Sequence, residues 1–235
     1  MSEPAPQGIH DRLNAAALWT IPVLAAFALI LSLPRFLEGM LALSGNAAIE
    51  DLRTGPAEPG RVDGLVHSRE RALAIVDRGK HRSELAAGLV LMAQFQEGDE
   101  RAQTLDRAVR EGEGAVLEAP ADAYAWFHLA EASFAREGAN QRAVDAVLTS
   151  IATGPYETNL LVPRLELLFA SRSYLEHASD DLVDIQVRTA WKRRLHDVVR
   201  AVRRHGAADI VRRGLEREPS LAENLDAALK DTNIR

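Results

Sequence analysis

An uninterrupted apolar stretch near the N-terminus gives way to an amphipathic pattern that continues to the C-terminus. Residues 15–33 carry no charged side chain over 19 positions, whereas from residue 63 onward apolar residues recur every three or four positions. This spacing marks one face of an α-helix, and no alternation typical of a strand runs to useful length. We predict an all-α protein with a long apolar helix followed by a helical domain.

The apolar stretch is long enough to cross a membrane. Its 19 residues, at a rise of about 1.5 Å each, reach about 28 Å, close to the thickness of the hydrocarbon layer. A cleaved signal peptide is the alternative, but its apolar core usually has only about 7–15 residues, and the preceding flank here holds a single arginine, Arg12. We expect residues 15–33 to form an uncleaved single span in a bacterial inner membrane.

The charges beside this stretch do not fix its orientation. Arg12 and the free amine lie on one side and Arg35 on the other. A short N-terminal tail, one span and a large C-terminal domain are often arranged with the tail in the cytoplasm. We therefore expect the C-terminal domain in the periplasm, and a cytoplasmic domain stays open.

Glycine and proline residues divide the rest of the chain. The apolar pattern runs to residue 43, stops at the sequence SGN and breaks again over residues 53–61. We expect a tail (1–14), a span with an amphipathic extension (15–43), a linker (44–62) and a helical domain (63–235). Helix ends within the domain are expected at Gly79, Glu97 and Gly98, Pro120, Gly138, Gly154 and Pro155, Ser179, Gly206 and Pro219.

One segment of the domain recurs 35 positions later in the chain. The paired positions are Pro120 and Pro155, Trp126 and Leu161, Glu131 and Glu166, Phe134 and Phe169, and Ala135 and Ala170. A helix-pair repeat of about 34 residues is the tetratricopeptide signature, and residues 80–175 resemble that family, most clearly over 121–155. Trp126 takes the early aromatic position, Leu129 and Ala130 the leucine and small positions, and Ala143 opens the second helix.

The resemblance implies an antiparallel helix-pair solenoid that binds another protein along a concave side formed by the first helices. On this basis the candidate partner-binding residues are Tyr124, Phe127, His128 and Glu131, while Trp126 and Phe134 are assigned to packing. Three residues depart from the family pattern. Gly112 stands where a bulky side chain is expected, which we interpret as a weak helix, and Pro163 and Arg164 occupy positions that ordinarily face a neighbouring helix.

The sequence offers little chemistry for catalysis. The absence of cysteine excludes disulfides, thiolate metal sites and cysteine nucleophiles. His128 with Glu131 is the best metal-like pair, but two such residues three apart on a helix are far more often a surface or groove pair. No phosphate loop, nucleophile elbow or dinucleotide fingerprint occurs. We expect no enzyme, no catalytic residues, no metal and no cofactor.

One segment concentrates positive charge in a chain whose net charge is −6. Residues 188–213 hold nine basic and two acidic side chains, and a helix over 181–205 would bury a stripe of Trp191, Leu195, Val198 and Val202. A neighbouring arc carries the candidate anion-facing residues Arg188, Lys192, Arg193, Arg200, Arg203 and Arg204. Either nearby acids such as Asp180, Asp181 and Asp184 pair with this arc, or it faces anionic lipid or an acidic polymer. Nucleic acid is not an expected partner.

The layout as a whole is that of an anchored scaffold. The chain is similar to small membrane-anchored repeat proteins of bacterial exopolysaccharide synthesis. The features that carry the similarity are an N-terminal anchor, degenerate repeats with Trp-x-x-Leu-Ala, and the sequences Gly-Pro-Tyr and LLVPRLEL. The similarity implies another membrane or envelope protein as partner, with polysaccharide synthesis or export as the setting. Two alternatives stay open: a periplasmic assembly chaperone that binds a client polypeptide, and a cytoplasmic-face regulator that binds anionic lipid through the basic helix.

Overall fold

The computed structural model describes residues 7–177 and 180–231, and within these ranges every regular element is helical. The helices are α1 (Gln7–Thr54), α2 (Pro59–Leu73), α3 (Gly79–Met92), α4 (Gly98–Glu118), α5 (Ala123–Glu137), α6 (Gln141–Thr153), α7 (Leu161–Ala170), α8 (Asp180–His205), α9 (Ala208–Leu215) and α10 (Pro219–Lys230). Short 3-10 turns lie at Ala93–Phe95, Thr158–Leu160 and Arg172–His177. The prediction of an all-helical chain is confirmed.

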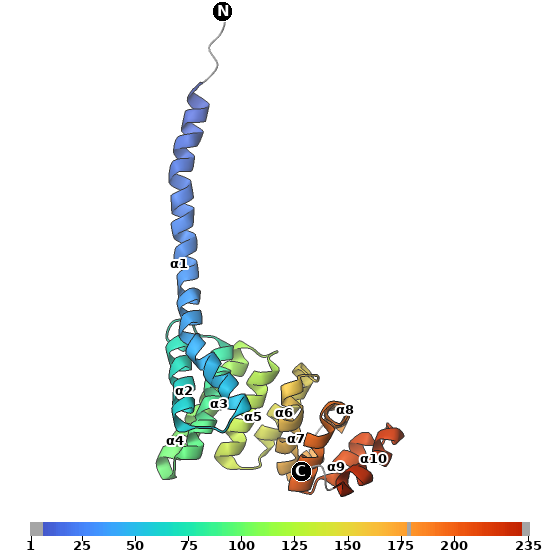
Figure 1. Cartoon of the computed structure of the whole chain (residues 1–235). Coiled ribbons are helices and arrows are strands. Elements are labelled where there is room, and N and C mark those ends of the chain that lie inside the picture. The colour runs from blue at the N-terminus through green and yellow to red at the C-terminus, as the bar shows by residue number, and fades with distance from the viewer. Residues whose placement is uncertain (1–6, 178–179, 232–235) are drawn as a thin grey trace, which may run out of the picture.

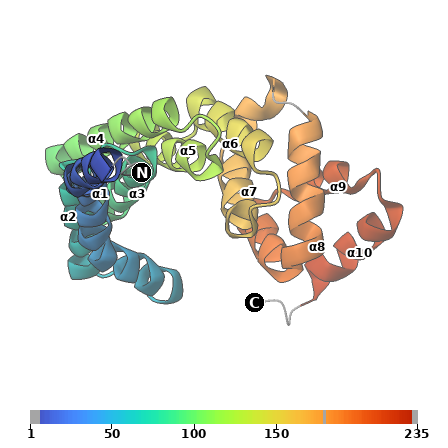
Figure 2. The ribbon, with the colours of Figure 1, turned by 90° about the horizontal axis from the view of Figure 1, so that it is seen from above.

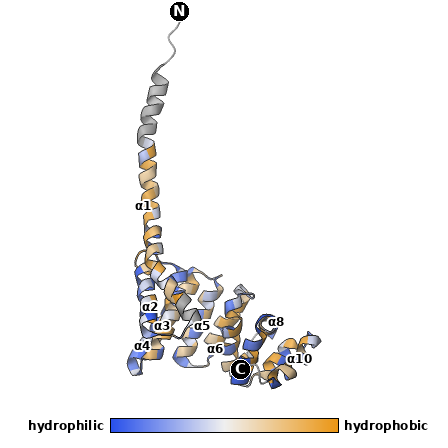
Figure 3. Cartoon of the chain, in the orientation of Figure 1, coloured by the Kyte–Doolittle hydropathy of each residue, from blue (hydrophilic) through white to orange (hydrophobic). Residues whose placement is uncertain are grey.

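The N-terminal part of α1 projects away from the rest of the molecule, whereas its C-terminal part packs on α2 (Figure 1). Its stretch Thr20–Ile49 is long and apolar enough to cross a membrane, and large side chains such as Ile21, Phe27 and Ile30 are exposed along it. Figure 3 shows this apolar surface continuing down to the domain. The predicted tail lies partly outside the described residues (1–6), and so do the side chains of residues 15–19 of the predicted span.

The linker expected over residues 44–62 is wrong, because α1 continues to Thr54 and only residues 55–58 separate it from α2. Gly45 does not end the helix. A Cβ at this position would lie 2.6 Å from Ser68 Oγ, so the glycine allows α1 to pack closely on α2. The same glycine that signals a break in sequence therefore marks a contact between helices.

A serine of α2 also enters the hydrogen-bond ladder of α1. The Ser68 hydroxyl accepts from the Gly45 N–H at 3.1 Å and donates to the Leu41 carbonyl at 2.8 Å, which is the pair that an unbroken helix would join directly. Pro34 removes a further donor from the ladder. Inserted side chains and prolines both bend helices, and α1 changes direction where it meets the domain (Figure 1).

The helices α2 to α7 follow one another around an arc (Figure 2). Each packs mainly against its neighbours in the chain, and α3 also contacts α5. The helix boundaries fall at the glycines and prolines that predicted them, including Gly138 and Gly206, whose positive φ angles of 76° and 64° favour glycine. The break expected at Ser179 lies outside the described residues.

Small residues bring the middle helices together. Ala130 and Ala143 are fully buried in one core, and Trp126 and Phe134 pack half-buried against it, in agreement with the packing assignment. Gly112 of α4 lies against α5, where a Cβ would come 3.0 Å from the Leu129 Cα. The interpretation of Gly112 as a weak point in a helix is therefore wrong, because the absence of a side chain permits the close approach.

The end of α6 is capped by a buried arginine from α7. The Arg164 guanidinium donates to the Ser150 carbonyl at 2.6 Å and to the Gly154 carbonyl at 2.9 Å, and it also contacts the Ser150 hydroxyl. Carbonyls at a helix C-terminus lack partners within the helix, so the guanidinium satisfies them. Burial lowers the pKa of Arg164 to about 10. This position departs from the repeat pattern because it caps the preceding helix.

Candidate functional site

The four predicted contact residues Tyr124, Phe127, His128 and Glu131 line a single groove of about 710 Å³. The helices α3 and α5 supply most of its lining, and α1, α2 and the segment around the beginning of α7 supply the rest. The apolar part of the lining comprises Ile49, Leu65, Ala87, Leu91, Leu160 and Pro163, besides the two aromatic rings. The rest of the lining is polar or charged and comprises Lys80, Ser83, Glu84, Asp122 and Asn159, besides His128 and Glu131. The groove therefore places polar and charged groups beside an apolar surface, a combination that can orient a bound molecule.

His128 is a hydrogen-bonding group of this groove. Its Nδ1 lies 2.8 Å from the buried Ser83 hydroxyl, and the rings of Tyr124 and Phe127 are tilted against it at centroid distances of 6.2 and 6.0 Å. Burial lowers the pKa of His128 to about 4, and the nearby carboxylates of Glu84 and Asp122 only partly oppose this effect. The imidazole is consequently neutral near pH 7 and can exchange hydrogen bonds without carrying charge.

Glu131 contributes a carboxyl group to the groove. It is half-buried, and no hydrogen bond or ion pair reaches its carboxyl group from the residues that the structure describes. Burial raises the pKa of Glu131 to about 7. At neutral pH this group is therefore poised between an acid that donates a hydrogen bond and an anion that would attract a cation.

The groove does not gather metal ligands. Among the described residues, no group of three or more His, Asp or Glu side chains could hold a metal ion. His128 and Glu131 thus have no third ligand in that part of the chain. The absence of enzymatic activity and of a cofactor stays a prediction.

The basic residues of α8 are engaged within the chain. Lys192 lies 2.6 Å from Glu218, Arg204 lies 2.5 Å from Glu166, and Arg200 forms an ion pair with Asp197. Arg188 contacts Asp184 and the Gly214 carbonyl, Arg193 lies over the Tyr156 ring and near Thr158, and Arg203 donates to the carbonyls of Leu229 and Asp231. Partners within the chain thus pair with many of the basic side chains that the sequence concentrates here.

The geometry of α8 also differs from the straight helix on which the arc was predicted. Arg194 has φ −140° and ψ 40°, so α8 is two helical segments joined at a kink. Trp191, Val198 and Val202 are buried as expected, while Leu195 is half-buried near the kink. The prediction of one continuous basic arc is wrong because residues before and after the kink do not share one helical face. Binding of an anion by these residues stays a prediction.

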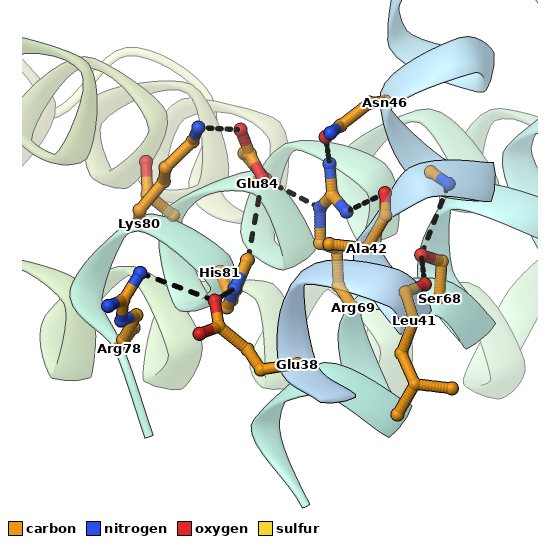
Figure 4. A network of polar contacts seen from close by, with 12 residues as sticks. Glu38, Leu41, Ala42, Asn46, Ser68, Arg69, Arg78, Lys80, His81 and Glu84 are labelled. Carbon is orange, nitrogen blue, oxygen red and sulfur yellow. Dashed lines mark hydrogen bonds and ion pairs between the residues drawn. The ribbon is translucent and has the colours of Figure 1, made fainter. Parts of the chain in front are cut away.

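A buried polar network joins α1 to α2 and α3 (Figure 4). The Glu38 carboxylate of α1 lies 2.5 Å from His81 Nε2 and 3.3 Å from Arg78 Nη1. The fully buried Arg69 of α2 pairs with Glu84 of α3 at 2.6 Å. Its guanidinium also donates to the Ala42 carbonyl at 3.0 Å and to the Asn46 side chain at 2.7 Å. We call this set of contacts the junction network.

Ionisation of two groups is coupled in the junction network. Contacts with Glu84 and Glu38 raise the pKa of His81 against the opposing effect of burial. Burial opposes ionisation of Glu84, yet contacts with His81 and Arg69 keep its pKa below the ordinary value. The sequence carried a signal for this network, since Glu38 interrupts an apolar pattern and Arg69 falls on the same helical face as Leu65 and Ala72.

No protein-family model matches this sequence, and a search of curated proteins found no match either. The function is therefore inferred from the residues and their arrangement.

Proposed function

We propose that this protein is a membrane-anchored scaffold, in which α1 attaches the helical domain to a membrane and the groove binds a segment of another protein. The observation that carries the proposal is the convergence of Tyr124, Phe127, His128 and Glu131 on one apolar groove. The junction network supports it further, because buried ion pairs fix the domain to its anchor. A scaffold with this layout tethers a partner and does not turn over a substrate.

A tetratricopeptide-like solenoid is part of the proposal. Neighbour-to-neighbour packing around an arc supports it, and so does the position of α3, α5 and α7 along the groove. In solenoids of stacked helix pairs, each pair buries its apolar face only against its neighbours, and the concave side is left to bind extended peptides or helices.

The chemistry of the groove indicates the kind of segment that it would bind. Phe127 and Leu65 are buried in the domain's own packing, so apolar side chains of a partner would cover the half-buried Tyr124 and Leu91. Lys or Arg of the partner would complement the carboxyl of Glu131, which has no partner among the described residues. The neutral His128 and the Tyr124 hydroxyl, which accepts from Asn159 at 3.5 Å, add hydrogen-bonding groups. We propose an apolar peptide segment with one basic residue as the occupant.

Site-specific photo-crosslinking in intact membranes tests the groove. A benzophenone amino acid at position 124, where the side chain is half-buried and lines the groove, should give a discrete adduct with a partner segment that contains a basic residue, identified by mass spectrometry. The matched control is position 95, an exposed phenylalanine between α3 and α4 outside the groove lining. Equal adducts at positions 124 and 95 would contradict the proposal.

The pH dependence of binding gives a second test. The carboxyl of Glu131 ionises as pH rises through about 7, so affinity for a basic peptide taken from the adduct should increase over that interval. Glu131→Gln should remove this increase and weaken binding at pH 8 by about tenfold, equivalent to ~1.4 kcal/mol. Titration calorimetry of the parent chain and of Glu131→Gln at pH 6 and pH 8 measures the effect. The same change in affinity with pH in both chains would exclude a contact between Glu131 and a cation of the peptide.

The location of the C-terminal domain relative to the membrane is a separate proposal from the groove, and so is the pathway in which the protein acts. We propose the periplasm, and alkaline phosphatase fused after Arg235 should then be active, since the enzyme works only outside the cytoplasm. An inactive fusion would favour the cytoplasmic regulator. Recovery of a stable complex in mild detergent would separate a scaffold from a chaperone with transient clients. The setting in polysaccharide synthesis or export rests on sequence resemblance alone.

A further inference from the structure

Among the described residues, five large apolar side chains of the domain are exposed outside α1: Ile75, Phe95, Leu117, Tyr156 and Tyr174. Three of them lie at or beside connections that adjoin one another. Ile75 follows α2 and is 43% exposed, Leu117 near the end of α4 is 82% exposed, and Tyr156 follows α6 and is 65% exposed. Neither packing nor the groove accounts for their exposure. Exposed apolar side chains on adjoining loops are typical of surfaces that meet another molecule or a membrane.

The three connections lie along one edge of the domain. A Cβ at Gly79, the first residue of α3, would lie 2.9 Å from the Ala119 Cβ at the end of α4. A Cβ at Gly154, at the end of α6, would lie 2.8 Å from the Ala123 Cβ at the start of α5. The connections α2–α3, α4–α5 and α6–α7 are thus neighbours. We call this the loop edge, and it lies at the end of the domain from which α1 departs (Figure 1).

The junction network fixes the distance between the loop edge and the apolar helix. Glu38 contacts Arg78 and His81 at the beginning of α3, immediately beside the α2–α3 connection. Glu38 lies five positions after Leu33, where the uncharged stretch ends, and five helical steps correspond to a rise of about 7.5 Å. Half of the difference between the full bilayer and its hydrocarbon core is about 5–8 Å. The junction therefore lies at the level of the lipid headgroups.

The exposed side chains of α1 near the junction are consistent with this level. Phe36 and Met40 are apolar and exposed, although they lie beyond the uncharged stretch. Aromatic and apolar side chains of this kind are favoured at the boundary between headgroups and acyl chains. Because Glu38 and Arg69 are buried in the same network, the domain is held against α1 and does not hang on a linker.

We propose that the loop edge, with Ile75, Leu117 and Tyr156, contacts the headgroup layer of the bilayer that α1 crosses. The domain then rests on the membrane surface through a second site beside its span. The occupant of this surface is lipid, because the rigid junction brings the edge to the bilayer before any other molecule needs to be present. The proposal rests on the anchoring role of α1 and is independent of what the groove binds.

Site-specific labelling of the full chain tests the proposal. The chain has no cysteine, so Ile75→Cys, Leu117→Cys and Tyr156→Cys each provide a single labelling position. Phe95→Cys is the matched control, an exposed position 16 residues after Gly79 on the far side of α3, about 24 Å along the helix. Each variant is labelled with an environment-sensitive fluorophore and reconstituted in nanodiscs of phosphatidylcholine with a nitroxide on the headgroup.

We expect severalfold stronger quenching at positions 75, 117 and 156 than at position 95. Equal quenching at all four positions, in a chain that floats with lipid vesicles, would overturn the surface contact while leaving the anchor intact. A chain that does not float would overturn both the anchor and the contact that depends on it. If quenching at positions 75, 117 and 156 falls as the number of chains per disc rises, a second copy of the chain covers the loop edge, and this result would also overturn the proposal.

Discussion

The junction network and the basic residues of α8 are both rich in charge, yet the structure uses this charge differently. At the junction, Arg69 and Glu38 are buried and each is held by partners from another helix. On α8, Arg200 and Arg204 are largely exposed and pair with carboxylates at the surface. The region with fewer charges therefore has the greater influence on how the molecule is assembled.

The difference follows from desolvation. Water screens an exposed ion pair so that it contributes only about 0.2–1 kcal/mol to stability. Removal of one partner from a buried pair leaves an uncompensated charge in a medium of low polarity, at a cost of about 3–5 kcal/mol. A count of charges along the sequence thus points to α8 as the region where ion pairs contribute most to stability, whereas burial points to the junction network.

The largest expected effect is the loss of the carboxylate that faces Arg69. Glu84→Leu should lower the free energy of unfolding by about 3–5 kcal/mol, because Arg69 is fully buried. The double variant Glu84→Leu with Arg69→Met should regain most of this loss. Urea titration in detergent, followed by tryptophan fluorescence, measures both, and Lys80→Ala, which removes the exposed neighbour of Glu84, is the control. Equal losses in the single and double variants would show that the buried charge is not the cause.

An intermediate effect is expected from the titration of His81. Its folded-state pKa is raised, so the protonated form stabilises the fold below about pH 6.5, and this contribution is lost as pH rises through the folded-state pKa. Glu38 on α1, Arg69 on α2, Glu84 on α3 and Arg78 immediately before α3 are the charged groups that face it. Stability curves of the parent and His81→Gln should therefore converge as pH rises above this interval. If the two curves of stability against pH stay parallel, protonation of His81 does not stabilise the fold.

The smallest effect is expected on α8. Arg204→Ala should change the free energy of unfolding by less than about 1 kcal/mol, because its pair with Glu166 is exposed. Since Asp197 and Glu166 already partner these guanidinium groups, Arg200→Ala with Arg204→Ala should leave binding of polyglutamate to the full chain almost unchanged. A large loss of polyglutamate binding would restore the anion-facing interpretation of this region.

Local signals in the sequence predicted much of the helical layout. Gly138 and Gly206 end helices because their backbone conformations are specific to glycine, and the apolar run in α1 follows from composition alone. The groove residues Tyr124, Phe127, His128 and Glu131 were predicted from the resemblance to helix-pair repeats, whose first helices form the concave side, and their spacing over two turns of α5 places them on one helical face. Their convergence with Ile49 and Pro163 required the structure, because those residues come from distant parts of the chain.

By itself, the sequence determined the type and boundaries of most helices, the apolar character of α1 and the candidate face of α5. Only the tertiary structure decided that Gly45 and Gly112 are contact points, that Arg69 and Arg164 are buried, and that Arg188, Lys192, Arg200, Arg203 and Arg204 of α8 have acidic or carbonyl partners. The physical reason is the range of the interactions. Helix formation depends on residues within about four positions, whereas Glu38 and His81 are 43 positions apart and meet only when the helices pack.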